Sequence, residues 1–102
     1  MTWLTLKVLG VLLDDPASDH YGLDLAKRAG TKISSVYPIL LRLEQAGWLT
    51  SHEEQINPTE AGRPRRRLYR LTETGAQASR QAILDAQRAL ASRPPSKPGW
   101  AT

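Results

Sequence analysis

Apolar residues recur at helical spacing in the middle of the chain. They follow one another at steps of three and four residues, as Val36, Ile39, Leu40 and Leu43. This period places them on one side of an α-helix. Serines crowd the start of the stretch near Ser34, and Gly47 stands where a left-handed cap would end a helix. We therefore predict a helix with an apolar side and a small, polar amino-terminal end.

Two helices are predicted before this stretch. The first runs from Trp3 to about Leu13 with Thr2 as its cap, and the second runs from about Tyr21 to Ala29 and ends at Gly30. A short helix, a turn containing glycine and a longer helix follow the order of a helix-turn-helix.

Apolar residues cover most of the circumference of the first helix. Such a helix is buried on two sides, and a chain of 102 residues has little protein to cover both. We expect its second side, together with a narrow apolar stripe on a last helix from Thr72 or Thr74 to about Ala91, to meet another subunit. An amphipathic helix with spare leucines is the alternative. The expected dimerisation residues are Trp3, Leu6, Leu9, Leu13, Ile83, Ala86 and Leu90.

After the third helix the apolar period changes to two. Trp48 to Ser51 predicts one strand, and the alternation from Arg67 to Leu71 predicts another. A polar connection with two prolines and a glycine joins them over residues 52–64. Two strands and a basic loop directly after such a helix form a wing, and we expect Trp48, Tyr69 and Leu71 to lie in the core.

The predicted fold class is mostly α with a small antiparallel β-wing. We expect three parts: a winged helix-turn-helix over residues 1–71, a C-terminal dimerisation helix over 72–91, and a disordered, proline-rich tail over 92–102. Trp100 in this tail has no evident partner.

Composition narrows the function. Lys and Arg number 14 against 10 Asp and Glu, which gives a net charge of +4 and favours an anionic partner. Cysteine is absent, and His20 and His52 have no partner at metal-ligand spacing. The carboxylates form no pair with a nucleophile, so we expect neither a metal, a cofactor nor enzymatic activity.

The longest apolar run, Trp3 to Leu13, contains Lys7 and falls well short of the ~20 residues that span a bilayer. It also lacks the basic head and small-residue cleavage site of a signal peptide. We therefore expect a cytoplasmic protein without a membrane association.

Three segments carry a family resemblance. They are Tyr21 to Lys27, Val36-Tyr37-Pro38-Ile39-Leu40 with Arg42-Leu43-Glu44 and Gly47, and Arg65 to Thr72 with Gly75. In this order they resemble the PadR-like transcriptional regulators, a family of winged helix-turn-helix repressors, over about residues 4–90. The resemblance implies a DNA-binding homodimer in which the first and last helices exchange contacts between subunits.

Two departures limit what the resemblance implies. Leu23 stands where the family commonly has an aromatic residue, which leaves Tyr21 as the replacement for a phosphate contact. The C-terminal part is a single helix, as in the shorter members, so a response to drugs or phenolic acids is not carried over. Any small-molecule effector stays unknown.

Candidate contacts to double-stranded DNA gather in two places. At the start of the third helix, side chains can reach base edges or phosphates, although Ser34 and Ser35 could instead be caps. On the wing, four arginines fall within five residues, which suits phosphate or minor-groove contact better than a merely solvated face. Alternation predicts that Arg66 and Arg67 point to opposite faces. The full set is Tyr21, Lys32, Ser34, Ser35, Tyr37, Pro38, Arg42, Arg63, Arg65, Arg66 and Arg67.

The sequence thus predicts a sequence-specific transcriptional regulator, a repressor acting as a homodimer with its third helix in the major groove. A winged-helix adaptor that binds an acidic protein is the alternative.

Overall fold

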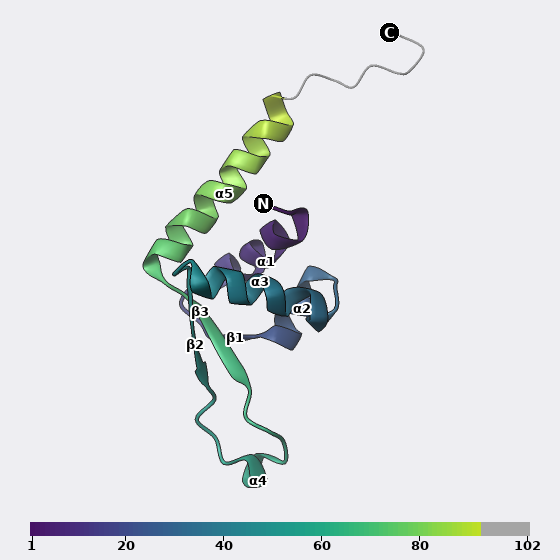
Figure 1. Ribbon diagram of the computed structural model, residues 1–102, viewed down its shortest axis with the longest axis vertical. Coiled ribbons are helices and arrows are strands. Elements are labelled where there is room, and N and C mark those ends of the chain that lie inside the picture. Colours follow the sequence, from purple (N-terminus) through teal and green to yellow (C-terminus); the bar gives the residue numbers. More distant parts are fainter. Residues whose placement is uncertain (93–102) are drawn as a thin grey trace, which may run out of the picture.

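The chain runs from a first helix through a helix-turn-helix and a β-hairpin into a long last helix (Figure 1). The computed structural model describes residues 1–92, so the expectations for the tail from residue 93 on and for Trp100 lie outside the described residues. The mostly helical class with a small antiparallel sheet is confirmed. The elements are α1 (Trp3–Asp14), β1 (His20–Tyr21), α2 (Gly22–Ala29), α3 (Ile33–Gln45), β2 (Leu49–Glu53), α4 (Pro58–Ala61), β3 (Arg67–Leu71) and α5 (Glu73–Ser92).

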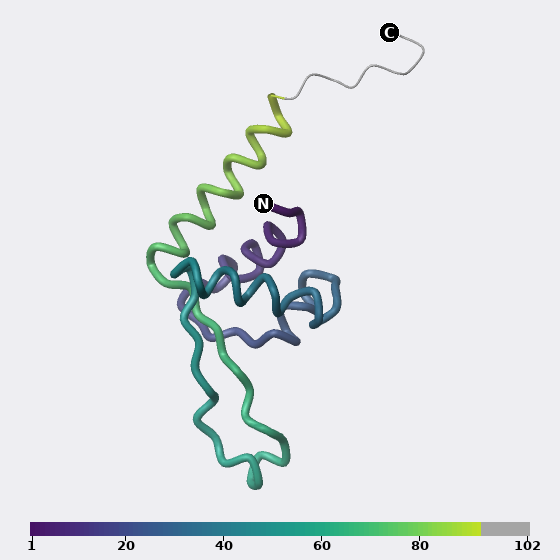
Figure 2. The backbone as a smooth tube through the Cα atoms, in the orientation of Figure 1, coloured from purple at the N-terminus to yellow at the C-terminus, as the bar shows by residue number. Residues whose placement is uncertain are grey.

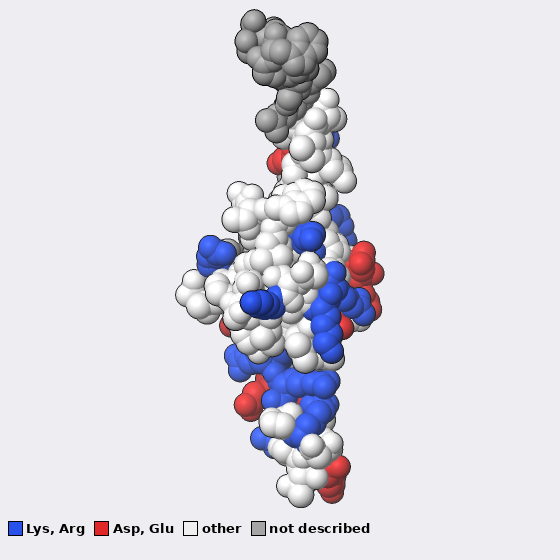
Figure 3. Space-filling view, turned by 90° about the vertical axis from the view of Figure 1, so that its right-hand side faces the viewer, with Lys and Arg blue, Asp and Glu red and all other residues white. Residues whose placement is uncertain are grey.

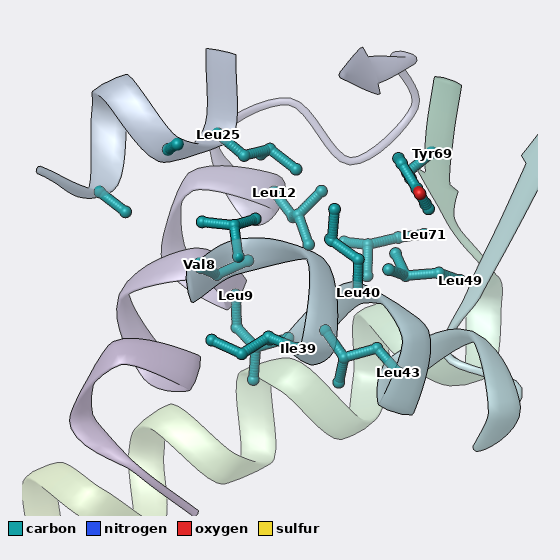
Figure 4. Packing of buried hydrophobic residues seen from close by; sticks show 13 residues of the cluster. Val8, Leu9, Leu12, Leu25, Ile39, Leu40, Leu43, Leu49, Tyr69 and Leu71 are labelled. Atoms are coloured by element: carbon teal, nitrogen blue, oxygen red, sulfur yellow. The ribbon is translucent and has the colours of Figure 1, made fainter. Parts of the chain in front are cut away.

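The core forms where α1, α2 and α3 meet the inner face of the sheet (Figure 4). Its members are almost all aliphatic, as a chain without phenylalanine requires. As predicted, Tyr69 and Leu71 are buried in this core and Trp48 packs against it partly buried. The buried apolar residues are Val8, Leu9, Leu12, Leu25, Ala26, Ala29, Val36, Ile39, Leu40, Leu43, Leu49, Tyr69 and Leu71.

Leu9 corrects one expectation. Its side chain is 0% exposed and lies inside the core of the single chain. It therefore cannot form part of a surface that meets another subunit, as we had predicted from the second apolar side of α1. The spacing of Thr5, Val8, Leu9 and Leu12 shows that the buried side of α1 includes Leu9.

The third helix begins one residue earlier than Ser34, at Ile33. Its N-cap is Lys32, whose side chain makes no capping hydrogen bond, so Ser34 and Ser35 lie inside the helix and are not its caps. Pro38 consequently stands in the second turn, where it lacks the amide that would bond to the Ser34 carbonyl. Gly47, with φ of 80°, follows the helix in the left-handed conformation that the sequence predicts.

The sheet has the strand order β1-β3-β2, and both pairings are antiparallel. The short strand β1 was not predicted: His20 pairs with Tyr69, and Tyr21 pairs with Leu68. Tyr21 is thus the residue before α2 rather than its first residue. β1 ties the start of the helix-turn-helix to the base of the wing.

The wing projects from one end of the body, and α5 extends away from the other (Figure 2). The pairing of the two wing strands reaches from Leu49 with Leu71 to Glu53 with Arg67. At the tip, the Asn57 side chain accepts hydrogen bonds from Thr59 N and Glu60 N and starts the one-turn helix α4, which was not predicted.

Candidate nucleic-acid interface

The outer side of α3 carries the first group of expected DNA contacts. Ser34, Tyr37, Pro38 and Leu41 line one open cleft of about 480 Å³ beside β3. All four side chains are exposed, because the helix turns a different set of residues to the core on its other side, namely Val36, Ile39, Leu40 and Leu43. A helix with a buried side and an open side of this kind can enter a groove of about 12 Å, the width of the DNA major groove.

A second groove of about 370 Å³ joins α3 to the wing. Tyr21, Tyr37, Arg66 and Arg67 line it, together with the arginines at positions 63 and 65. Tyr37 lines both this groove and the cleft on α3, so the two hollows meet at its ring. Figure 3 shows basic side chains gathered between the body of the molecule and the wing. The fold therefore brings together two sets of residues that lie far apart in the sequence.

The ring of Tyr37 packs against the start of α2. A Cβ built on Gly22 would lie 3.1 Å from the Tyr37 Cε1 atom, closer than ordinary van der Waals contact. Gly22 thus leaves space for the ring between α2 and α3. This contact holds the tyrosine at the meeting point of the two grooves.

Arg66 stands directly before β3 and Arg67 is its first residue, and the two side chains contact different partners. The Arg66 guanidinium carbon lies 4.2 Å from the centre of the Tyr21 ring, a cation–π contact. Arg67 Nε donates to Ser51 Oγ at 3.1 Å. These contacts position each guanidinium group in the groove and leave further N–H donors of both arginines for an anion.

Arg63 has a partner that the sequence did not reveal. Its two terminal nitrogens donate to the two carboxylate oxygens of Glu54 at 2.6 and 2.9 Å, and Arg66 N donates to the same carboxylate at 3.3 Å. The hydrogen bond from Arg63 is the main reason why the pKa of Glu54 is lowered to about 2. The Glu54 carboxylate offsets the charge of Arg63, and this ion pair connects the two arms of the wing.

Arg65 also makes a bond within the wing, because its Nε donates to Ile56 O at 3.0 Å. Arg42 lies elsewhere: it lines a groove with the start of α1 and Trp48, on another flank of α3. Lys32 is exposed at the N-cap of α3. Arg66 and Arg67 line the groove that Tyr37 shares with the wing, and the side-chain contacts given above for these two arginines are not to carboxylates.

Leu41 and Gly22 are site residues that sequence reasoning missed. Leu41 falls outside the three- and four-residue repeat of the buried positions on α3. This departure from the repeat could have indicated that its apolar side chain is exposed. Gly22 carried no local signal, since its close neighbour Tyr37 is distant in the sequence.

A separate apolar groove of about 220 Å³ lies between α1 and α5. Five of the seven predicted dimerisation residues line it: Trp3, Leu6, Ile83, Ala86 and Leu90. Trp3 and Leu90 are 65% and 61% exposed, which is unusual for large apolar side chains on neighbouring helices. Leu13 is partly buried and does not line this groove.

The family model described as the transcriptional regulator PadR-like family matches residues 8–81. The chain belongs to this PadR-like family. The match covers the second half of α1, the helix-turn-helix, the wing and the first half of α5. Comparison with curated proteins found no match to the sequence.

Solved structures agree on the fold of this PadR-like chain. A PadR-like transcription factor from Bacteroides fragilis is 19% identical with a TM-score of 0.69, over 87% of this chain and 84% of that one. Bordetella bronchiseptica BpsR is 17% identical with a TM-score of 0.71, over 99% and 66%. The PcaV regulator of Streptomyces coelicolor is 23% identical with a TM-score of 0.65, over 88% and 60%. The chain thus spans less than two thirds of PcaV.

Within residues 1–92, no helix combines the length and the apolar composition that crossing a bilayer requires.

Proposed function

We propose that this PadR-like protein is a sequence-specific DNA-binding regulator that acts as a homodimer in the cytoplasm. In this proposal α3 enters the major groove, and the wing contacts the flanking backbone or minor groove. The observation that carries the proposal is the groove where Tyr37 of α3 meets Arg66 and Arg67 of the wing. Arginines beside an exposed helix suit a polyanion, because each phosphate they neutralise releases counterions.

The relatives support the same assignment. The structure of BpsR concerns regulation of its DNA binding by 6-hydroxynicotinic acid, and that regulator has the same fold. PcaV was determined with its natural ligand.

The apolar groove between α1 and α5 supports the homodimer. A second copy of the chain would bury the exposed side chains of Trp3 and Leu90, which water otherwise surrounds. A twofold dimer places its two recognition helices on half-sites that are about 34–36 Å apart or a multiple of this. Repression is the simplest outcome, since a dimer on a promoter excludes other proteins by occupancy alone.

Selection of bound duplexes from a random pool, followed by salt titration, tests the proposal. We expect one sequence to be enriched, and we expect Arg66→Ala with Arg67→Ala to weaken binding and to reduce the salt slope by about 2. Arg80→Ala with Arg88→Ala removes the same charge from exposed positions of α5 and serves as the matched control. Duplex binding that depends neither on salt nor on Arg66 and Arg67 would contradict the proposal. Tight binding of an acidic protein would then favour the adaptor.

A further inference from the structure

The outer side of α3 presents a large apolar side chain that the core does not use. Leu41 is 58% exposed in the middle of the helix. It lines the cleft on α3 beside Tyr37 and Pro38, whose ring stands about one turn before it. Pro38 and Leu41 therefore form an exposed apolar surface on the outer side of α3, after its polar start.

The charges around this cleft indicate what can occupy it. Glu44 lines the same cleft, and its carboxylate accepts a hydrogen bond from Ser51 Oγ at 2.8 Å. A carboxylate at this place repels phosphate, so the cleft does not suit the DNA backbone. The neighbouring groove, which shares Tyr37, carries Arg66 and Arg67 and does suit it. A nucleic acid held by the wing would thus present its bases, rather than its phosphates, to Leu41.

The major groove offers one apolar group, the C5 methyl of thymine. We propose that Leu41 is a specificity-determining residue, which selects thymine by packing on this methyl group with Pro38 beside it. The inference rests on the proposed DNA binding and adds the base that this part of α3 selects. Sequence specificity would then come from an aliphatic contact as well as from hydrogen bonds made by the polar start of the helix.

Deoxyuridine provides a direct probe, because it lacks the methyl group of thymine and retains its hydrogen-bonding edge. In the duplex that selection enriches, each thymine is replaced singly by deoxyuridine, and affinity is measured for the full chain and for Leu41→Ala. At one or more positions we expect the wild type to lose about fourfold in affinity, the value of one buried methyl group. Leu41→Ala should show no loss at the same positions.

Two further variants complete the experiment. Leu84→Ala removes the same atoms from an exposed leucine of α5 and should keep the wild-type loss. Leu41→Met has an apolar side chain of similar volume, so it should show the same loss of affinity on deoxyuridine substitution as the wild type. This variant keeps the inference testable if Leu41→Ala proves less stable.

The outcomes separate this inference from the proposed function. Enrichment of a duplex without a deoxyuridine effect in the wild type, or with an effect that persists in Leu41→Ala, would overturn the role of Leu41 alone. If no duplex is enriched at all, both the DNA-binding function and the thymine selection are wrong.

Discussion

The backbone of Trp48 lies directly against the α-carbon of Gly75: a Cβ on this glycine would stand 2.7 Å from Trp48 Cα. Thr72 connects the same two segments, because its N donates to Trp48 O at 3.0 Å and its Oγ1 donates to Gly47 O at 2.8 Å. The junction joins the end of α3 to the start of α5. It therefore sets the direction of α5 relative to α3.

Gly75→Ala should destabilise the fold strongly. The added methyl group would overlap the backbone of Trp48, which cannot move aside as a flexible side chain would. We expect a loss of about 3 kcal/mol or more in the free energy of unfolding, measured by urea denaturation. Gly10→Ala is the control, since a Cβ there meets no atom of the other described segments within 4 Å. Equal stability of the two variants would contradict the close approach.

Ser79→Ala should stabilise the protein. Ser79 is fully buried on α5, and among the described residues its hydroxyl has no hydrogen-bond partner. Since an unsatisfied buried hydroxyl costs about 1–3 kcal/mol, its removal should raise the free energy of unfolding by a part of that amount. Ser92→Ala, at the exposed end of the same helix, should change it little. A clear loss of stability in Ser79→Ala would show that the hydroxyl does have a partner.

The ion pair of the wing should depend on pH. The folded-state pKa of Glu54 is about 2, below the ordinary 4.5, chiefly because Arg63 donates a hydrogen bond to it. The pair therefore stabilises the wing fully above pH 4.5, and this contribution is lost as the pH falls toward 2. An NMR titration of the carboxyl carbon should find the low value in the wild type and a value nearer 4.5 in Arg63→Ala. Arg65→Ala should leave it low, because Arg65 bonds to Ile56 O instead.

Charges in the apolar groove should separate the proposed dimer. Ile83→Glu with Leu90→Glu places carboxylates where α1 and α5 leave large apolar side chains exposed. We expect light scattering to fall from twice the chain mass of 11.3 kDa to the mass of one chain. Leu84→Glu is the matched control, as Leu84 is 43% exposed on α5 and does not line the groove. A wild-type protein that is monomeric at micromolar concentration would contradict the dimer.

Residue patterns predicted most helix limits within one or two residues. The cap at Gly30 and the left-handed Gly47 were also evident, because caps and apolar periods act over a few neighbouring residues. The two-residue strand β1 escaped prediction since it exists only through its pairing with β3, which lies much later in the chain. The one-turn helix α4 escaped prediction because it lies in a mostly polar connection, where four residues are too few to show an apolar period.

The candidate site divides in the same way. Its residue types, a helix with a polar start and a run of arginines, are visible in the sequence and pointed to an anionic partner. Which of these groups lie close together is decided by the fold. Tyr37 lines one groove with Arg66 and Arg67, whereas Arg63 forms an ion pair with Glu54. Leu9 was likewise assigned to the wrong surface, because a helix with apolar residues nearly all round does not reveal which side the core will cover. Local patterns specify elements through short-range sterics and hydrogen bonding, but burial and ion pairing depend on partners that only the folded chain brings into contact.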